Sequence, residues 1–200
     1  MIEIPKSYER INLVRRVALP NELDFKGLHP VEYKNVRENN QLVQNLLRSG
    51  QLTLANVSGS VLEIGPGYGA CTPVLKVFSS DVQVVEKSKS GIVIAEKKIL
   101  PAERVHLGQD GITFMNSRPE EFNFIASFMF GPLSHGHQED LMKEIYTAAM
   151  TALRPDGEFF MTSDPHSFEV IEKTCKYPDV EIVKLKEFDP VFIGRKPDKI

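Results

Sequence analysis

The segment with the most distinctive chemistry is a glycine-rich loop that follows a short apolar run. Within residues 61–70 (VLEIGPGYGA), Gly65, Gly67 and Gly69 are spaced two residues apart. Glycines at this spacing let the backbone turn sharply and approach a ligand without Cβ clashes. With Ala70, the loop also satisfies the G-x-G-x-x-G/A fingerprint of dinucleotide-binding proteins. The glycine loop alone therefore leaves the ligand open.

Three carboxylates distinguish between the possible ligands. Glu63 lies two residues before the first glycine, where it would serve a pyrophosphate poorly but would stabilise an amino group or a sulfonium. Glu86 ends the next apolar run, in a position to accept both hydroxyls of a ribose, and Asp110 follows a third run within GQDG. Ligands of open α/β sheets bind at the carboxyl ends of the strands. The three acids therefore predict a site for a cationic nucleoside.

The elements that must position these residues are strands alternating with helices. Apolar patterning predicts strands over residues 60–64, 81–86, 104–107, 123–128 and 158–162, and helices over residues 32–49, 72–78, 88–100 and 138–153. This alternation implies right-handed crossovers and a mostly parallel sheet. The last two runs, residues 180–186 and 190–193, are joined by so few residues that they must form an antiparallel hairpin. The predicted fold class is α/β, a doubly wound and mostly parallel seven-stranded sheet with an antiparallel C-terminal hairpin.

The composition is that of one globular domain. Of the 200 residues, 42% are hydrophobic and 26% are charged, which excludes a disordered acidic chain, a collagen-like repeat and a heptad-only coiled coil. The formal net charge of −3 argues against the whole-surface basic field that drives non-specific nucleic-acid binding. We expect a single domain over residues 1–200, with an N-terminal cap and helix over 1–50 and an α/β core over 51–200.

The cysteines and the N-terminus bear on the location of the protein. Cys71 and Cys175 are far apart and form no CxxC or Cys/His cluster, so we expect free thiols in a reducing compartment and no metal site. The N-terminus has no apolar h-region, and no apolar run approaches the roughly 20 residues needed to span a bilayer. We therefore expect a cytoplasmic protein without a membrane partner.

Four motifs, in order, resemble those of the class I S-adenosylmethionine-dependent methyltransferases, which have a Rossmann-like fold. VLEIGPGYG resembles their first motif, E/D-x-G-x-G-x-G, VQVVEKS the second, and GQDG the third. LRPDGEFFMT is similar to the L-K-P-G-G stretch that enters the fifth strand, with Asp156 in place of the first glycine. The resemblance covers roughly residues 41–193. It implies S-adenosylmethionine as cofactor and S-adenosylhomocysteine as product.

The resemblance also implies a set of cofactor-binding residues. Glu63 would act toward the amino group of the cofactor, Glu86 would bind the ribose hydroxyls, and Asp110 would bind the adenine amino group. Tyr68 and Lys87 would flank the pocket. The full implied set is Glu63, Gly65, Pro66, Gly67, Tyr68, Gly69, Glu86, Lys87, Asp110, Gly111, Ser127 and Phe128.

The candidate catalytic groups are two histidines in the loop after the fourth strand. His135 or His137 could take a proton from a hydroxyl or amine as it is methylated. The alternative is that each histidine caps or begins the following helix, and many enzymes of this family need no strong base. Ser127 and Phe128 would lie under the adenosine near the methyl group. Asn123, where the family commonly has Asp, is expected beside the transferred methyl.

The acceptor is constrained by two motifs that this loop does not contain. It lacks N/D-P-P-Y/F, which resembling enzymes use to methylate exocyclic amines, and the Pro-Cys pair of cytosine C5 enzymes. The favoured function is methyl transfer to O or N of a small-molecule acceptor. The alternatives are a methyltransferase acting on protein or RNA, and a non-catalytic S-adenosylmethionine-binding module. A nicotinamide dehydrogenase is a third alternative, disfavoured by Glu63 and Asp110. No sequence feature specifies the acceptor or the oligomeric state.

Overall fold

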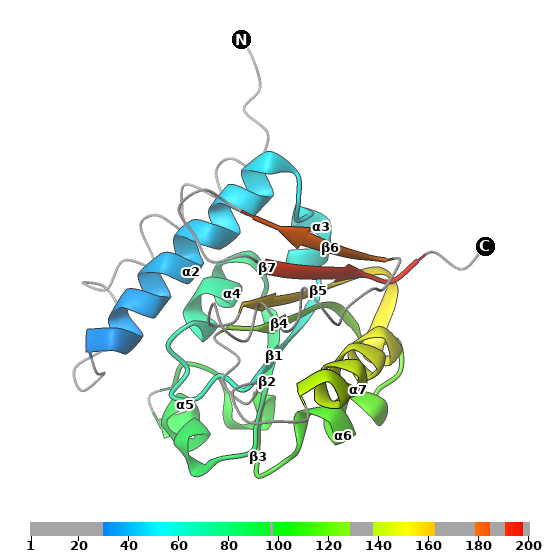
Figure 1. Ribbon diagram of the computed structural model, residues 1–200. Coiled ribbons are helices and arrows are strands. Elements are labelled where there is room, and N and C mark those ends of the chain that lie inside the picture. The colour runs from blue at the N-terminus through cyan, green and yellow to red at the C-terminus, as the bar shows by residue number, and fades with distance from the viewer. Residues whose placement is uncertain (1–29, 97, 129–137, 163–178, 185–190, 198–200) are drawn as a thin grey trace.

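The structure is a computed structural model that describes residues 30–96, 98–128, 138–162, 179–184 and 191–197, and its centre is a sheet of seven strands (Figure 1). The strands are β1 (Ser60–Ile64), β2 (Asp81–Glu86), β3 (Val105–Leu107), β4 (Phe122–Ser127), β5 (Leu153–Thr162), β6 (Val180–Val183) and β7 (Val191–Arg195). Their order is β3-β2-β1-β4-β5-β7-β6. β1 to β5 are parallel, and β7 is antiparallel to both β5 and β6. The predicted fold class is confirmed.

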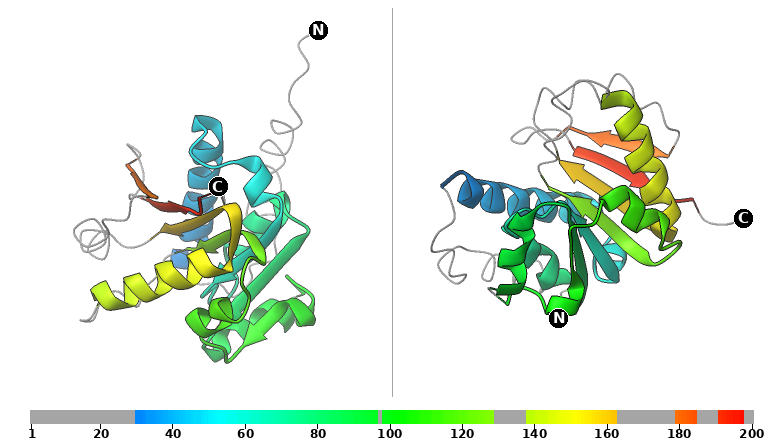
Figure 2. Two further views of the ribbon diagram at one scale, coloured as in Figure 1. Left: turned by 90° about the vertical axis from the view of Figure 1, so that its right-hand side faces the viewer. Right: turned by 90° about the horizontal axis from the view of Figure 1, so that it is seen from below.

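Helices cover both faces of this sheet. The described helices are α2 (Pro30–Ser49), α3 (Leu54–Val57), α4 (Thr72–Phe78), α5 (Ile92–Glu96), α6 (Gly111–Asn116) and α7 (Gln138–Ala152), with 3₁₀ turns η1 (Lys89–Gly91) and η2 (Ala102–Arg104). α2 and α4 lie on one face, and α6 and α7 on the other (Figure 1). Figure 2 shows the same two layers from the side and from below. None of the described helices is long and apolar enough to cross a bilayer.

The two faces are built by alternation along each strand. In β1, Val61 packs into the core beneath α2 and α4, whereas Leu62 packs into the core beneath α6 and α7. In β4, Phe124 and Ile125 divide in the same way. All four side chains are fully buried, and each contributes about 1.5–3 kcal/mol relative to an exposed side chain. The central strands are therefore apolar on both sides, as expected for a covered parallel sheet.

α2 is an amphipathic helix, as its sequence pattern predicts. Leu42, Val43 and Leu46 are buried against the sheet, which gives the helix its tertiary support. The helix ends at Ser49, and Gly50 follows with a φ of +77°, a left-handed conformation typical of a helix C-terminus. The connector after Gly50 leads into α3 and then β1.

β5 begins five residues before the predicted strand and contains an irregularity. Leu153 pairs with Phe122 of β4, but the next β4 partner, Phe124, pairs with Glu158. Asp156 lies in the extra length with a φ of +60°, and its carbonyl oxygen accepts a hydrogen bond from Asn56 Nδ2 at 2.8 Å. Asp tolerates left-handed backbone better than most residues, so this position accommodates the replacement of the expected glycine.

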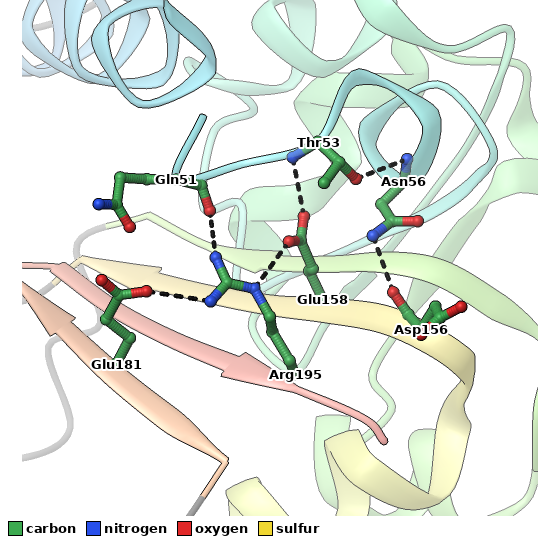
Figure 3. A network of polar contacts seen from close by, with 7 residues as sticks. All are labelled: Gln51, Thr53, Asn56, Asp156, Glu158, Glu181 and Arg195. Carbon is green, nitrogen blue, oxygen red and sulfur yellow. Dashed lines mark hydrogen bonds and ion pairs between the residues drawn. The ribbon is translucent and has the colours of Figure 1, made fainter. Parts of the chain in front are cut away.

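A polar network joins the connector before β1 to strands β5, β7 and β6 (Figure 3). It lies near the edge of the sheet where the parallel strands begin, which we call the amino edge. Glu158 of β5 accepts hydrogen bonds from Arg195 Nε at 3.1 Å and from the Thr53 backbone N–H at 3.2 Å. Arg195 also donates to Glu181 of β6 at 3.0 Å and to the Gln51 carbonyl oxygen. We call these five residues the amino-edge network. It ties four separate segments of the chain together.

Candidate functional site

The glycine loop after β1 requires glycine for its backbone conformation. Gly65, Gly67 and Gly69 have φ values of +63°, +57° and +76°, all in the left-handed region. At Gly69 space is limiting as well, because a Cβ there would lie 2.5 Å from Cγ1 of Ile94. A side chain at any of the three positions would strain the backbone. The loop thus turns tightly at the edge where the parallel strands end, which we call the carboxyl edge.

Glu86, the last residue of β2, connects this loop to the next strand. Its side chain is buried, and Oε2 accepts a hydrogen bond from the Gly67 backbone N–H at 2.9 Å. Oε1 accepts a hydrogen bond from the Ser88 backbone N–H at 2.7 Å. An ionised carboxylate offers about four lone-pair sites, so these two bonds leave capacity for two further donors. Glu86 can therefore hold the loop and bind a pair of hydroxyls at the same time.

Asp110 lies at the same edge and caps α6. Its Oδ1 accepts a hydrogen bond from the Thr113 backbone N–H at 3.1 Å, and its Oδ2 lies 3.8 Å from Nζ of Lys87. Lys87 is largely exposed and Asp110 is about half exposed, so this ion pair contributes little to stability. Next to the cap, a Cβ on Gly111 would lie 2.9 Å from Cγ2 of Ile64, so α6 begins in close contact with β1.

A cavity of about 320 Å³ opens at the carboxyl edge on the α6 and α7 side of the sheet. Half of its lining comes from the predicted set: Gly65, Glu86, Lys87, Asp110, Gly111 and Ser127. The other half is apolar and was not predicted: Ile64, Val85, Ile112, Met115, Leu141 and Ile145. Apolar walls with a few convergent polar groups are typical of small-molecule sites. The periodicity of residues 138–153 identified an apolar face on that helix, but not its contribution to a cavity.

Glu63 faces the opposite side of the sheet. It has the orientation of Val61, toward α2 and α4, and only 1% of its surface is exposed. Oε2 accepts a hydrogen bond from Thr72 Oγ1 at 2.6 Å. Burial raises the pKa of the Glu63 carboxyl to about 7; the Thr72 hydrogen bond lowers it, and the charge of Glu86 raises it further.

Two further polar groups accompany Glu63 on that side. Asn39 of α2 is buried, and its Nδ2 donates to Sγ of Cys71 at 3.5 Å. Burial raises the pKa of the Cys71 thiol, and the charge of Glu63 raises it further. The thiol is therefore neutral and is not a nucleophile. We call Asn39, Glu63, Cys71 and Thr72 the Glu63 cluster. Sequence reasoning missed Asn39, because only folding brings α2 to the glycine loop.

The remaining residues of the implied set lie around the loop and the end of β4. Ser127 is buried, and its Oγ donates to the Ile64 carbonyl oxygen at 3.2 Å, joining the ends of β4 and β1. Phe128 is also buried, with its ring centroid 5.5 Å from that of Phe160. Tyr68 is 49% exposed at the tip of the loop. Tyr68 and Phe128 are outside the lining of the cavity, as are Glu63, Pro66, Gly67 and Gly69.

The position of Asn123 differs from the expected one, and the catalytic role expected for the two histidines is not tested by the structure. Asn123 Oδ1 accepts a hydrogen bond from the Ser60 backbone N–H at 3.0 Å, where β4 and β1 begin. The expectation that Asn123 lies beside a transferred methyl group was wrong, because the carboxyl edge is at the Ser127 end of β4. His135 and His137 lie outside the described residues. Within the described ranges, no group of three or more His, Cys, Asp or Glu residues could hold a metal ion.

No protein-family model and no curated protein sequence matches this chain. Solved structures do match: a methyltransferase from Geobacter sulfurreducens has a TM-score of 0.57 at 10% identity, covering 98% of this chain and 92% of that chain. N-methyltransferase NodS from Bradyrhizobium japonicum WM9, in complex with S-adenosyl-L-homocysteine, has a TM-score of 0.57 at 18% identity, covering 94% of this chain and 99% of that chain. Together with the strand order, these similarities show that the chain has the fold of the class I S-adenosylmethionine-dependent methyltransferases.

Proposed function

We propose that this protein is an S-adenosylmethionine-dependent methyltransferase that transfers a methyl group to O or N of a small-molecule acceptor. The observation that carries the proposal is the construction of the carboxyl edge. A left-handed glycine loop is held by Glu86 beside an apolar-walled cavity, with Asp110 at its rim. This combination of groups suits a nucleoside that carries a hydroxyl pair and an exocyclic amine.

The residues present fit that cofactor. Glu86 has acceptor capacity left for the ribose hydroxyls, and Asp110 presents Oδ2 to an amine. Ile112 and Met115 provide apolar walls for a flat base. When bound, the cofactor supplies the electrophilic methyl group on its sulfonium. The chain orients the reactants and excludes water, which is a large part of catalysis in a displacement of this kind.

Several finer points belong to this proposal. NodS, a structure of the same fold, is an N-methyltransferase, which supports N as one acceptor atom. The net charge of −3 favours a small molecule over RNA. His135 and His137 are the proposed bases. We also propose a cytoplasmic location and a single domain.

Calorimetric titration tests the cofactor assignment. We expect micromolar binding of S-adenosylmethionine and S-adenosylhomocysteine, and no comparable binding of NAD. Glu86→Ala is expected to weaken the first two at least tenfold, whereas Glu86→Gln, which keeps one acceptor oxygen, is expected to be intermediate. Glu96→Ala, on the exposed surface of α5, is the matched control and should bind like the parent protein. Tight binding of NAD alone would contradict the proposal.

Turnover is tested separately from binding. S-adenosylhomocysteine release is measured with panels of small amines and hydroxy compounds, and with protein and RNA as competing acceptor classes. Release that depends on a small acceptor supports the proposal. Release that depends on RNA or protein would contradict the small-molecule part. Cofactor binding without release in any panel would favour the non-catalytic binding module.

A further inference from the structure

β3 is an edge strand whose outer side has no strand partner in the described part of the chain. It stands at one end of the strand order and pairs only with β2 (Figure 1). No residue from 101 to 109 is buried, so the exposed run is longer than the strand itself. Edge strands are commonly protected by a proline or a lysine, and residues 105–107 (VHL) contain neither. This edge is therefore open to pairing with another strand.

Exposed apolar side chains lie along the same edge. Within the described ranges the exposed large apolar side chains are Tyr68, Ile92 and Leu107. Leu107 ends β3 and is 37% exposed, and Ile92 begins α5 and is 47% exposed. A Cβ on Gly91 would lie 2.7 Å from Cδ2 of Leu107, so Leu107 packs beside η1 and close to the start of α5. Val105 is partly buried and lies on the same face of β3 as Leu107. Apolar side chains gathered at an open strand edge indicate an interaction surface.

Two charges of opposite sign lie at the two ends of this edge. Glu103 is exposed just before the amino end of β3. Lys89 is exposed in η1, which packs against Leu107 at the carboxyl end of β3. Among the described residues neither charge has an ion-pair partner, whereas Lys87 and Arg104 already pair with carboxylates of the same chain. The edge is therefore negative at one end and positive at the other.

This charge arrangement is complementary to itself under a two-fold rotation. In an antiparallel pair of identical strands, the amino end of each strand lies beside the carboxyl end of the other. Glu103 of each copy then approaches the Lys89 end of the other copy, and the contact occurs twice. A pairing centred on His106 also places Leu107 of each copy opposite Val105 of the other, on one face of the sheet. A parallel pair would place like charges side by side.

We propose that two copies of this protein form a two-fold dimer by antiparallel pairing of β3 with β3, which joins the two seven-stranded sheets into one. Backbone hydrogen bonds form along the strand pair, Leu107 and Ile92 become covered, and Lys89 pairs with Glu103 of the second copy. β3 has three residues, so the interface is small and the dimer dissociates on dilution. β3 leads directly to Asp110, so the second copy lies beside the rim of the cavity. Dimerisation in this way does not depend on the proposed cofactor.

Sedimentation velocity on the full chain, over roughly 1–200 µM, measures self-association. We expect a monomer–dimer equilibrium for the parent protein. Leu107→Lys places a charge within the strand pair, so it should weaken association at least about hundredfold. Thr147→Lys, on the exposed side of α7, introduces the same side chain away from β3. This matched control should associate like the parent protein.

Exchange of the two charges tests the antiparallel orientation. Lys89→Glu brings two acids together at each contact, and Glu103→Lys brings two lysines together. Each variant should therefore weaken association about tenfold. The double variant, Lys89→Glu with Glu103→Lys, should restore the affinity to within about threefold of the parent, which a role in the stability of the monomer would not produce. Arg48→Glu, at the exposed end of α2, changes the net charge as Lys89→Glu does and should have no effect. Thermal unfolding checks that each variant is folded.

Three outcomes would overturn the proposal. The first is a protein that stays monomeric over the whole concentration range, which includes the case that the edge binds an unlike partner. The second is a dimer that Leu107→Lys leaves intact, because it would use another surface. The third is a double variant that does not regain association, because the strands would then not be antiparallel. None of these outcomes affects the proposed function, which calorimetry with S-adenosylhomocysteine tests separately.

Discussion

Two buried glutamates, one near each edge of the sheet, have opposite surroundings. Glu158 of β5 and Glu63 of β1 are both 1% exposed. Glu158 accepts hydrogen bonds from the Arg195 guanidinium and from the Thr53 backbone N–H (Figure 3). Glu63, in contrast, receives one described hydrogen bond, from the neutral Thr72 hydroxyl. The two residues are equally buried, but only Glu158 has a cation and a backbone N–H to stabilise its charge.

The two carboxyls therefore affect the stability of the protein in different ways. A buried carboxylate with a guanidinium and an amide is satisfied within the protein, and removing a partner leaves an uncompensated charge. The pKa of Arg195 is raised, because its hydrogen bonds to Glu181 and Glu158 outweigh the lowering by burial, which is the largest single influence. A buried acid without such partners is a candidate for function. We therefore infer that the amino-edge network stabilises the fold, whereas the burial of the Glu63 carboxyl costs stability.

The largest effect is expected on breaking the amino-edge network. Arg195→Met leaves the Glu158 carboxylate buried without a cation, so we expect a loss of about 3–5 kcal/mol in the free energy of unfolding. Urea denaturation measures it. Arg154→Met is the matched control. Arg154 is an exposed arginine of β5, the strand that contains Glu158, and its replacement should change stability by less than about 0.5 kcal/mol. Equal losses in the two variants would contradict a specific role for Arg195.

Replacement of Glu63 is expected to increase the stability of the protein, in contrast to the loss expected for Arg195→Met. Its pKa rises from 4.5 to about 7 on folding, so the native state binds its proton more tightly than the unfolded state does. Stability from this group is therefore present below about pH 4.5 and is lost as the pH rises through about 7. Without ligand, Glu63→Gln should become more stable relative to the parent by about 3 kcal/mol between pH 4.5 and pH 8. Thermal or urea unfolding across this range measures it, and a constant difference would be inconsistent with a protonated Glu63.

Two helix caps, one near each edge of the sheet, allow the two edges to be compared through smaller changes in stability. Thr53 caps α3 through Asn56 N at 3.3 Å, and Asp110 caps α6 through Thr113 N at 3.1 Å. Thr53→Ala and Asp110→Ala should each cost about 1 kcal/mol of stability. Only Asp110→Ala should also weaken S-adenosylhomocysteine binding, measured by calorimetry. A similar affinity loss in Thr53→Ala would show that binding depends on stability at both edges.

The smallest effect is expected at Lys87. Its ion pair with Asp110 is exposed, so Lys87→Met should change the free energy of unfolding by less than about 0.5 kcal/mol. Urea denaturation at low and high salt measures this change. A loss above 1 kcal/mol would mean that the carboxyl edge also contains a strong structural ion pair, which would weaken the contrast between the edges.

Much of the fold could be predicted from the sequence because the signals are local. β1, α4 and β2 have the predicted bounds, since short apolar runs there are bounded by glycines, serines and an early helix proline. The predicted helix over 88–100 is instead a 3₁₀ turn followed by the short α5. α6 was missed because its six residues are too few to establish a helical period, although Asp110 is a recognisable cap.

The site was predictable only where a motif carries it. The spacing of the glycines and acids predicted a site formed by Glu63, Glu86 and Asp110. Glu86 and Asp110 line the cavity at the carboxyl edge, whereas Glu63 faces the opposite side of the sheet. The apolar walls of the cavity could not be found in this way, because a residue such as Leu141 reads as core until folding brings α7 to that edge. Asn39 and Arg195 were not predicted for the same reason. Their partners, Cys71 and Glu158, lie 32 and 37 residues away in the sequence.

The position of β7 has a consequence for how the protein emerges from the ribosome. β7 follows β6 in the chain, yet it lies between β5 and β6 in the sheet. β6 is therefore synthesised before the strand that it pairs with, and the outer edge of β5 stays open until residues 191–195 have left the exit tunnel. An open strand edge is prone to pair with other chains. The nascent protein passes through an aggregation-sensitive interval that ends only when Arg195 reaches Glu158.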